Sequence, residues 1–450
     1  MSEEQGYSGK ALECLKKNNA KVGDSIKITA GLQTYSGILM PRYESGDDKH
    51  LVLKLGNGYN VSIVVSDIQK IQILSSPEAK PKQSEERKED LVEKMRIRAG
   101  VPSPKIKILW TGGTITSSVD YKTGGVTPKE NSYDIYEEAP ELKNLFDGDG
   151  EYLAGLKPNI DTEVLFTEFS ENLQPDHWIK IAEKLDSLAD SDYKGILVAH
   201  GTDTMHYTSS FLSFALAGFP IPVALVGSQR SPDRASSDAT QNLIAASKFL
   251  VESNTKGIFL VMHHNDNDQT VACHLGTRVR KNHTSKRGAF ETMGGDPAFI
   301  IAEGKIKKNM QDDFFKDEKY NPRMKIGTKV SLVKYHPGYD PKLIENLIQT
   351  GCKAIIFEGT GLGHVGRTMY DVVKNAKEND LFLGMTSQCI DGRVRMTVYE
   401  SGRDLLELGI TPLENMTPET SLVKAMWALG NSNDVDEMKS LMLKNIASEF

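Results

Sequence analysis

The stretch that decides the fold reads Lys105-Ile-Lys-Ile-Leu-Trp-Thr-Gly-Gly-Thr-Ile115. Residues 105–110 predict a strand, and the glycines at positions 112 and 113 predict a tight turn after it, because glycine readily adopts positive φ. This turn would place Thr114 at the carboxyl end of the strand. A βα turn whose threonines only cap the next helix fits the same residues. No Gly-Lys-Ser/Thr follows, which disfavours a phosphate-binding loop.

Strands and helices alternate along the chain after residue 104. We expect strands at residues 106–110, 164–169, 195–200, 223–227 and 257–262, and helices at residues 176–188, 207–217 and 235–251. A second set of strands is expected at residues 330–334, 354–358 and 381–385. This alternation predicts an α/β fold with parallel sheets covered on both faces. Ligands of such sheets bind at the carboxyl ends of the strands, where the threonine motif lies.

The chain is too long for a single hydrophobic core. It has 450 residues, whereas single cores stop growing at roughly 250–300 residues. Short strands separated by turn signals, including the hairpin signal Asn57-Gly58, predict a small SH3/Sm-like β-barrel ahead of the α/β body. We expect this barrel at residues 1–75, a charged linker at 76–104, an α/β domain with the threonine motifs at 105–320 and a C-terminal α/β domain at 321–450.

Composition and charge narrow the classes of function. The net charge of −7 argues against a nucleic-acid footprint over the whole protein, which would be basic. The four cysteines form no Cys-x-x-Cys pair, so neither a zinc ribbon nor a disulfide framework is expected. Residues 208–229 carry no charge, but Pro220 and Pro222 favour a buried helix and a short strand over a membrane span. The acidic, polar start predicts no signal peptide and therefore a cytoplasmic protein.

Three further groups of residues could carry chemistry. The motif His-Gly-Thr-Asp-Thr at residues 200–204 follows a predicted strand, and its side chains either face the first motif or cap the next helix. Ser-Glu-Asn at residues 170–172 also follows a strand and could bind the charged end of an amino acid or cap a helix. Lys281 lies in a basic stretch, where the residues alone do not distinguish it from Arg280 or Lys286.

Two other patterns are weaker indications of a functional site. Gly-x-Gly-x-x-Gly at residues 361–366 lies between a strand and a helix, as in dinucleotide-binding domains, but no carboxylate follows the strand at 381–385. A glycine-rich turn that lines another pocket is favoured there. The pairs His263-His264 and Cys273-His274 fit no standard zinc spacing, so we expect no metal site.

Taken together, the motifs resemble the bacterial-type L-asparaginase/glutaminase family. Residues 111–115, 170–171, 202–203 and 281 match that family in order and spacing, and the resemblance covers roughly residues 105–430. It implies a two-domain asparaginase-like body. The barrel-like segment and the linker ahead of this body resemble the D-subunit family of archaeal glutamyl-tRNA(Gln) amidotransferases.

The resemblance implies a function as well as a fold. Members of the family release ammonia from glutamine or asparagine. A partner, the E subunit, binds the tRNA and uses ATP and Mg to activate Glu-tRNA(Gln), which the ammonia converts to Gln-tRNA(Gln). The resemblance further implies a homodimer within a heterotetramer, contact with the tRNA only through the partner, no cofactor on this chain and no membrane association.

The family's roles carry over to individual positions. The resemblance assigns the nucleophile to Thr114, a second threonine with its proton relay to Thr202, Asp203 and Lys281, and substrate contacts to Ser170, Glu171, Gly113 and Tyr121. Many asparaginases carry Gln where Glu171 stands, and this departure bears on recognition of the substrate amine. A threonine hydroxyl is a poor nucleophile until a base removes its proton. The resemblance implies that the relay supplies this base.

Three other functions fit some of the same residues. A free-standing cytoplasmic L-asparaginase with an added N-terminal module would use the same motifs. A non-enzymatic module could bind amino acids in the same crevice. A dinucleotide enzyme would use the glycines at residues 361–366. Ammonia release from Asn and Gln, and the absorbance of the purified protein, distinguish these functions.

Overall fold

The computed structural model describes residues 6–42, 47–55, 60–75, 104–113, 115, 117–119, 126–128, 159–231, 237–266, 270–310 and 319–450. The chain divides into two compact units. The first contains Met1–Pro102, Thr114–Asn144 and Gln229–Thr240, and the second contains Ser103–Gly113, Leu145–Ser228 and Gln241–Phe450. Apart from Pro104, the expected linker at residues 76–104 lies outside the described residues, and the expected domain boundaries stay predictions.

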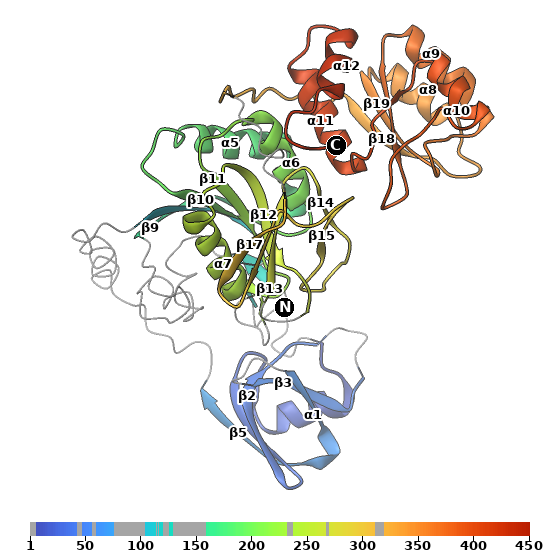
Figure 1. Cartoon of the computed structure of the whole chain (residues 1–450). Helices are drawn as coiled ribbons and strands as arrows, with labels where there is room; N and C mark the ends of the chain where they lie inside the picture. The colour runs from blue at the N-terminus through green and yellow to red at the C-terminus, as the bar shows by residue number, and fades with distance from the viewer. Residues whose placement is uncertain are drawn as a thin grey trace. The chain divides into compact units, whose positions relative to one another are not determined.

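An antiparallel sheet of five strands forms the first part of the chain (Figure 1). Its strands are β1 (Ser25–Ala30), β2 (Gln33–Leu39), β3 (His50–Leu55), β4 (Asn60–Val64) and β5 (Ile68–Ser75), with helix α1 (Gly9–Lys17) ahead of them and the short helix η1 (Val65–Asp67) between β4 and β5. Alternate residues of β1, Ile26 and Ile28, enter a core to which α1 contributes Ala11 and Leu15.

The strand order of this sheet is β4-β3-β2-β1-β5. Within the described residues the edge strands β4 and β5 do not pair with each other, so closure into a barrel stays a prediction. Strands β3 and β4 pair antiparallel with His50 opposite Val64, as a hairpin requires. The Asn57-Gly58 turn predicted between them lies outside the described residues.

The α/β body begins with an eight-stranded sheet. Its strands are β6 (Lys105–Gly112), β9 (Asn159–Glu168), β10 (Gly195–Ala199), β11 (Pro222–Val226), β12 (Gly257–His263), β13 (Thr270–Leu275), β16 (Phe299–Ala302) and β17 (Lys305–Lys308), in the order β17-β16-β13-β12-β11-β10-β6-β9. The five strands from β12 to β9 run parallel, as predicted. The antiparallel edge formed by β13, β16 and β17 was not predicted. Between β13 and β16 the chain forms a hairpin of two short strands, at residues 279–281 and 290–292, in place of a helix, so the alternation of strand and helix stops there.

Helices cover both faces of this sheet. Helices α5 (Pro175–Asp186) and α6 (Met205–Ala215) share a core with Ile258 and Leu260 of β12. The intervening Phe259 points to the other face, where its ring lies 4.9 Å from that of Phe249 in α7 (Ala239–Glu252). The buried helix and strand predicted within residues 208–229 are therefore α6 and β11. Among the described residues, no helix is long and apolar enough to cross a membrane.

The second parallel sheet and two short hairpins complete the fold. The sheet contains β18 (Val330–Lys334), β19 (Ala354–Gly359), β20 (Phe382–Ser387) and β21 (Thr411–Pro412), and the hairpins pair β7 (Ser117–Val119) with β8 (Val126–Pro128) and β14 (Val279–Lys281) with β15 (Phe290–Thr292). The accompanying helices are α8 (Lys342–Gln349), the short η7 (Arg367–Met369), α9 (Tyr370–Glu378), α10 (Glu400–Glu407), α11 (Pro418–Gly430) and α12 (Val435–Leu443). The predicted α/β architecture is thus confirmed.

Helix α11 joins this second sheet to the first one. Pro418 occupies its first turn, and the Thr417 side chain caps it by accepting the N–H of Thr420 at 3.2 Å. The ring of Trp427 lies 5.9 Å from that of Phe214 in α6, within one shared apolar core. The two parallel sheets are therefore connected by the packing of α6 against α11.

Candidate active site

Three turns at the carboxyl ends of neighbouring strands meet at one point. Strand β6 ends at Gly112 and Gly113 follows it, with φ angles of 105° and 82°. A Cβ on Gly113 would lie 2.3 Å from the Cα of Gly201, which follows β10. A Cβ on Gly201 would in turn lie 2.7 Å from the Cβ of Ser170, which follows β9. Only glycine permits this approach, so the sequence brings the three turns together through its glycines.

Hydrogen bonds hold β6 to both of its neighbours at this point. The Thr111 hydroxyl donates to the carbonyl of Ala199 in β10 at 2.8 Å. The N–H of Gly113 donates to the carbonyl of Glu168 in β9 at 3.1 Å. This N–H is therefore engaged within the protein, and the substrate contact assigned to Gly113 stays a prediction. Another donor would have to stabilise a developing oxyanion here.

Ser170 is anchored to the second threonine motif from two sides. Its hydroxyl accepts the N–H of Asp203 at 3.2 Å, and its carbonyl accepts the hydroxyl of Thr204 at 2.8 Å. Ser170 is buried, whereas Glu171, in the same short helix η5 (Ser170–Asn172), is exposed. The structure therefore places Ser170 against Asp203 and Thr204, while the side chain of the adjacent Glu171 is turned to solvent.

Lys281 reaches the second motif from a separate hairpin. It is the last residue of β14, opposite Phe290 of β15. Its Nζ donates to Thr202 Oγ1 at 2.9 Å and to Asp203 Oδ1 at 2.6 Å. The Lys281 side chain is only 9% exposed, whereas that of Asp203 is 65% exposed. The buried amine is thus held between a buried hydroxyl and a carboxylate that faces solvent.

The geometry separates Lys281 from its basic neighbour. The Arg280 guanidinium forms an ion pair with Glu419 of α11 at 3.1 Å. Adjacent residues of a strand point to opposite sides, which explains why Arg280 and Lys281 have different partners. The sequence alone contains no signal for this choice, because the pairing of β14 with β15 sets the direction of each side chain.

Two buried histidines lie in the second motif or just after it. Around His200, Nδ1 lies 2.6 Å from the Gly201 carbonyl oxygen and Nε2 lies 2.9 Å from Thr208 Oγ1. Burial lowers the pKa of His200 to about 4. Burial, followed by the charges of Arg280 and Lys281, lowers the pKa of His206 to about 3. Both imidazoles are therefore neutral at neutral pH, and no pattern in the sequence indicated that they are buried.

The remaining predicted residues and patterns have different outcomes. Thr114 and Tyr121 lie outside the described residues, so the nucleophile and the lid tyrosine stay predictions. In the glycine-rich turn at residues 361–366, Gly363 has a φ of 99°, and a Cβ there would lie 2.4 Å from Val394 Cγ1. That turn packs against its own domain.

Two of the three histidines considered for metal binding, His263 and His274, have side-chain partners within the protein. His263 Nδ1 lies 2.6 Å from Asn242 Oδ1, and His274 Nδ1 lies 2.7 Å from Thr292 Oγ1. Both histidines are buried. Among the residues that the structure describes, no group of three or more His, Cys, Asp or Glu side chains could hold a metal ion.

Models of three protein domains match most of the chain. The model described as "Asparaginase, N-terminal" matches residues 105–313, and the "Glutaminase/Asparaginase C-terminal domain" matches residues 329–442. The "GatD N-terminal domain" matches residues 20–74, which contain the antiparallel sheet. The α/β body is therefore an asparaginase fold, preceded by a domain that has its own family.

Similar proteins extend this likeness over the whole chain. The D subunit of the glutamyl-tRNA(Gln) amidotransferase from Sulfolobus acidocaldarius is 42% identical over 99% of this chain and 95% of its own length. Its counterpart from Pyrococcus furiosus is 41% identical over 97% of each chain. Among solved structures, the thermostable L-asparaginase from Thermococcus kodakarensis has a TM-score of 0.67 and 30% identity, and the match covers 77% of this chain and 99% of that one. The chain belongs to the family of glutamyl-tRNA(Gln) amidotransferase D subunits.

Proposed function

We propose that this chain is the amidohydrolase component of a glutamyl-tRNA(Gln) amidotransferase. It releases ammonia from glutamine, or from asparagine, and the ammonia converts Glu-tRNA(Gln) to Gln-tRNA(Gln) on a partner protein. The observation that carries this proposal is the likeness to amidotransferase D subunits over 99% of the chain, N-terminal domain included. The solved L-asparaginase matches only 77% of the chain.

The proposed chemistry rests on the contact of Lys281 with the second motif. In its uncharged form, the Lys281 amine can accept the proton of the Thr202 hydroxyl, whose oxygen lies 2.9 Å away. The carboxylate of Asp203, 2.6 Å from the same nitrogen, orients the amine and stabilises the ammonium that results. These three residues together form a proton relay at the carboxyl end of β10.

The proposed nucleophile is Thr114, with a covalent intermediate. Its hydroxyl oxygen attacks the side-chain carbamoyl carbon of the substrate, the C–N bond breaks, and the proton released by the Thr114 hydroxyl passes to the nitrogen, which leaves as ammonia. Water then attacks the ester carbon and loses a proton to the relay through Thr202. The C–O bond to Thr114 breaks, and the relay returns the proton to the Thr114 oxygen. Ser170, Glu171, Gly113 and Tyr121 are the proposed contacts for the rest of the substrate.

The partners and the location belong to the same proposal. The partner is the E subunit of the amidotransferase, which would bind Glu-tRNA(Gln) and use ATP and Mg, so that this chain holds no cofactor of its own. Two copies of this chain would form a homodimer within a heterotetramer in the cytoplasm. The net charge of −7 supports a role in which the tRNA is bound by the partner.

Steady-state ammonia release tests the proposal. The assay uses Gln and Asn as substrates, with this chain alone, with the E subunit, and with the E subunit plus Glu-tRNA(Gln) and ATP. We expect a stable complex with the E subunit and a glutaminase rate that rises when the charged tRNA is added. Rapid hydrolysis of asparagine by the isolated chain, without a complex, would instead support the alternative function, a free-standing L-asparaginase. The 30% identity to the Thermococcus kodakarensis enzyme is the observation behind this alternative.

A further inference from the structure

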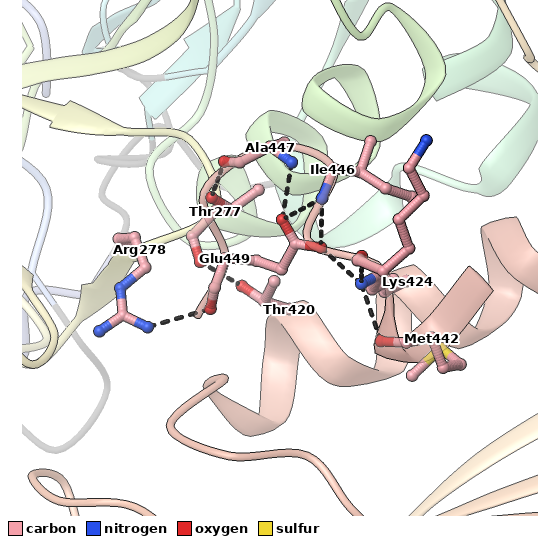
Figure 2. Close-up of polar contacts among 9 residues, drawn as sticks. Thr277, Arg278, Thr420, Lys424, Met442, Ile446, Ala447 and Glu449 are labelled. Carbon is pink, nitrogen blue, oxygen red and sulfur yellow. Dashed lines mark hydrogen bonds and ion pairs between the residues drawn. The ribbon is translucent and has the colours of Figure 1, made fainter. Parts of the chain in front are cut away.

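The segment that follows α12 is tied into the protein by a buried ion pair (Figure 2). We call residues 444–450 the α12 extension. The side chains of Lys424, in α11, and Glu449 are both 0% exposed, and the Lys424 ammonium contacts the Glu449 carboxylate. The same ammonium donates to the carbonyls of Met442 and Lys444 at 2.8 and 2.7 Å. All three of its hydrogens therefore have acceptors.

The Glu449 carboxylate also folds the α12 extension back on itself. It accepts the N–H of Ile446 at 3.0 Å and the N–H of Ala447 at 2.7 Å. A buried carboxylate with this many donors is held in a fixed place, because each lost bond would leave a buried polar group unsatisfied. The extension is thus a rigid loop whose carbonyl groups are available to neighbouring residues.

Those carbonyl groups bind the two residues that lead into β14. The Thr277 hydroxyl donates to the Ala447 carbonyl at 2.8 Å, and the Arg278 guanidinium donates to the Glu449 carbonyl at 3.0 Å. Arg278 also donates to the carbonyl of Met293, just after β15, at 2.6 Å. Figure 2 shows Thr277 and Arg278 beside the extension. One arginine therefore joins the extension to both ends of the hairpin.

Strand β14 connects the residues bound by the extension to Lys281 of the proposed relay. Arg278 immediately precedes β14, and Lys281 is its last residue. A strand rises by only about 3.3 Å per residue, so the two positions are roughly 10 Å apart on one rigid segment. A displacement of about 1 Å at a reacting group can lower a rate about 100-fold. The distance of 2.9 Å between Lys281 and Thr202 thus depends on how firmly β14 is held.

We propose that the α12 extension is a positioning element for the proton relay, with Thr277 and Arg278 as positioning residues that hold Lys281 against Thr202. This inference rests on the proposed function, because it assigns a purpose to the placement of the Lys281 amine. The extension itself lies outside the relay: neither Ala447 nor Glu449 contacts Thr202, Asp203 or Lys281 among the hydrogen bonds of the described residues.

Two conservative variants test the inference in the complex with the E subunit. Thr277→Val keeps the shape of the side chain but removes the donor to Ala447. Arg278→Lys keeps the charge but removes the planar fork that reaches both Met293 and Glu449. We expect each variant to lower kcat for glutamine hydrolysis about tenfold or more, to leave KM within about twofold, and to shift the pH dependence of kcat.

A control and a third variant separate positioning from stability. Glu252→Gln removes the ion pair with Lys248 on α7, which is unconnected to β14, and should leave kcat, KM and the pH profile as in the unmodified protein. The double variant Lys424→Met with Glu449→Gln removes both buried charges at once and so avoids leaving one unpaired. It should behave like Thr277→Val. A loss of folded protein alone would lower the amplitude of the pH profile without moving it, and that result would overturn the inference.

The Lys281→Met variant distinguishes failure of the inference from failure of the proposed function. If Lys281→Met retains the unmodified kcat, the relay itself is wrong. If Lys281→Met is at least about 100-fold slower while Thr277→Val and Arg278→Lys match the unmodified protein in kcat, KM and pH profile, the relay stands and only the positioning role is wrong.

Discussion

Gly113 and Gly201 approach so closely that a Cβ on Gly113 would lie 2.3 Å from the Cα of Gly201. The contact joins the turns that follow β6 and β10, which are neighbours in the parallel sheet. Backbone atoms, and not the flexible end of a side chain, stand opposite Gly113. The close approach therefore fixes how far the second threonine motif lies from the end of β6.

The variant Gly113→Ala tests this close approach. The added methyl group must displace the turn at Gly201, and the φ of 82° is unfavourable for alanine. We expect the free energy of unfolding to fall by about 1–3 kcal/mol and ammonia release to be largely lost. Gly295→Ala is the matched control, because no heavy atom lies within 4 Å of a Cβ built there. Equal stability of the two variants in urea unfolding would contradict the prediction.

The variant Lys281→Met removes the amine of the proposed relay. The methionine side chain has a similar length but cannot accept the proton of Thr202, so kcat for ammonia release should fall by about 10²–10⁴-fold. Lys286→Met is the control from the same basic stretch, and it should retain the unmodified kcat within about twofold. Similar losses in both variants would mean that the charge of the stretch matters, and not the contact with Thr202.

Asp203→Asn separates catalysis from stability. The Asp203 side chain is 65% exposed, so water screens its attraction to Lys281. We expect the free energy of unfolding to change by no more than about 0.5 kcal/mol. The amine loses the charge that orients it, however, so kcat should fall by at least about tenfold. Thermal unfolding and ammonia release, measured on the same preparation, check both parts.

Much of the fold could be predicted from the sequence because its signals are local. Residues 105–110 ahead of the glycine turn predict β6, and the uncharged segment broken by Pro220 and Pro222 predicts α6 and β11. The antiparallel edge strands β13, β16 and β17 are short and carry no such signal. Strand β5 and helix α1, which accompany the first sheet, were also not predicted.

Local sequence signals predict only part of the candidate active site. Thr202 and Asp203 follow a predicted strand, so their place at the sheet edge could be predicted. Lys281 could be chosen only through the family resemblance, because 79 positions separate it from Thr202 and a hairpin of its own delivers it. The roles of His200 and Arg278 depend wholly on tertiary contacts. Such contacts leave no pattern in a single sequence.

The buried His206 predicts that stability falls in mild acid. Burial lowers its pKa to about 3 in the folded protein, whereas an exposed histidine has a pKa near 6.5. Between these two values the unfolded chain binds a proton that the folded protein does not bind, so stability falls as the pH falls below about 6.5. From pH 7 to pH 5, this one group should lower the free energy of unfolding by about 2 kcal/mol.

The variant His206→Phe isolates that contribution. Phenylalanine cannot be protonated, yet it keeps a ring beside Tyr207 and Phe290, whose centroids lie 4.5 and 6.4 Å from that of His206. In urea unfolding at pH 7 and pH 5, the difference between the two pH values should be smaller in His206→Phe by about 2 kcal/mol. Exposed His336→Gln should leave that difference unchanged. If His206→Phe loses as much stability between the two pH values as the unmodified protein, then His206 is not held neutral by burial, and the acid sensitivity must come from other groups.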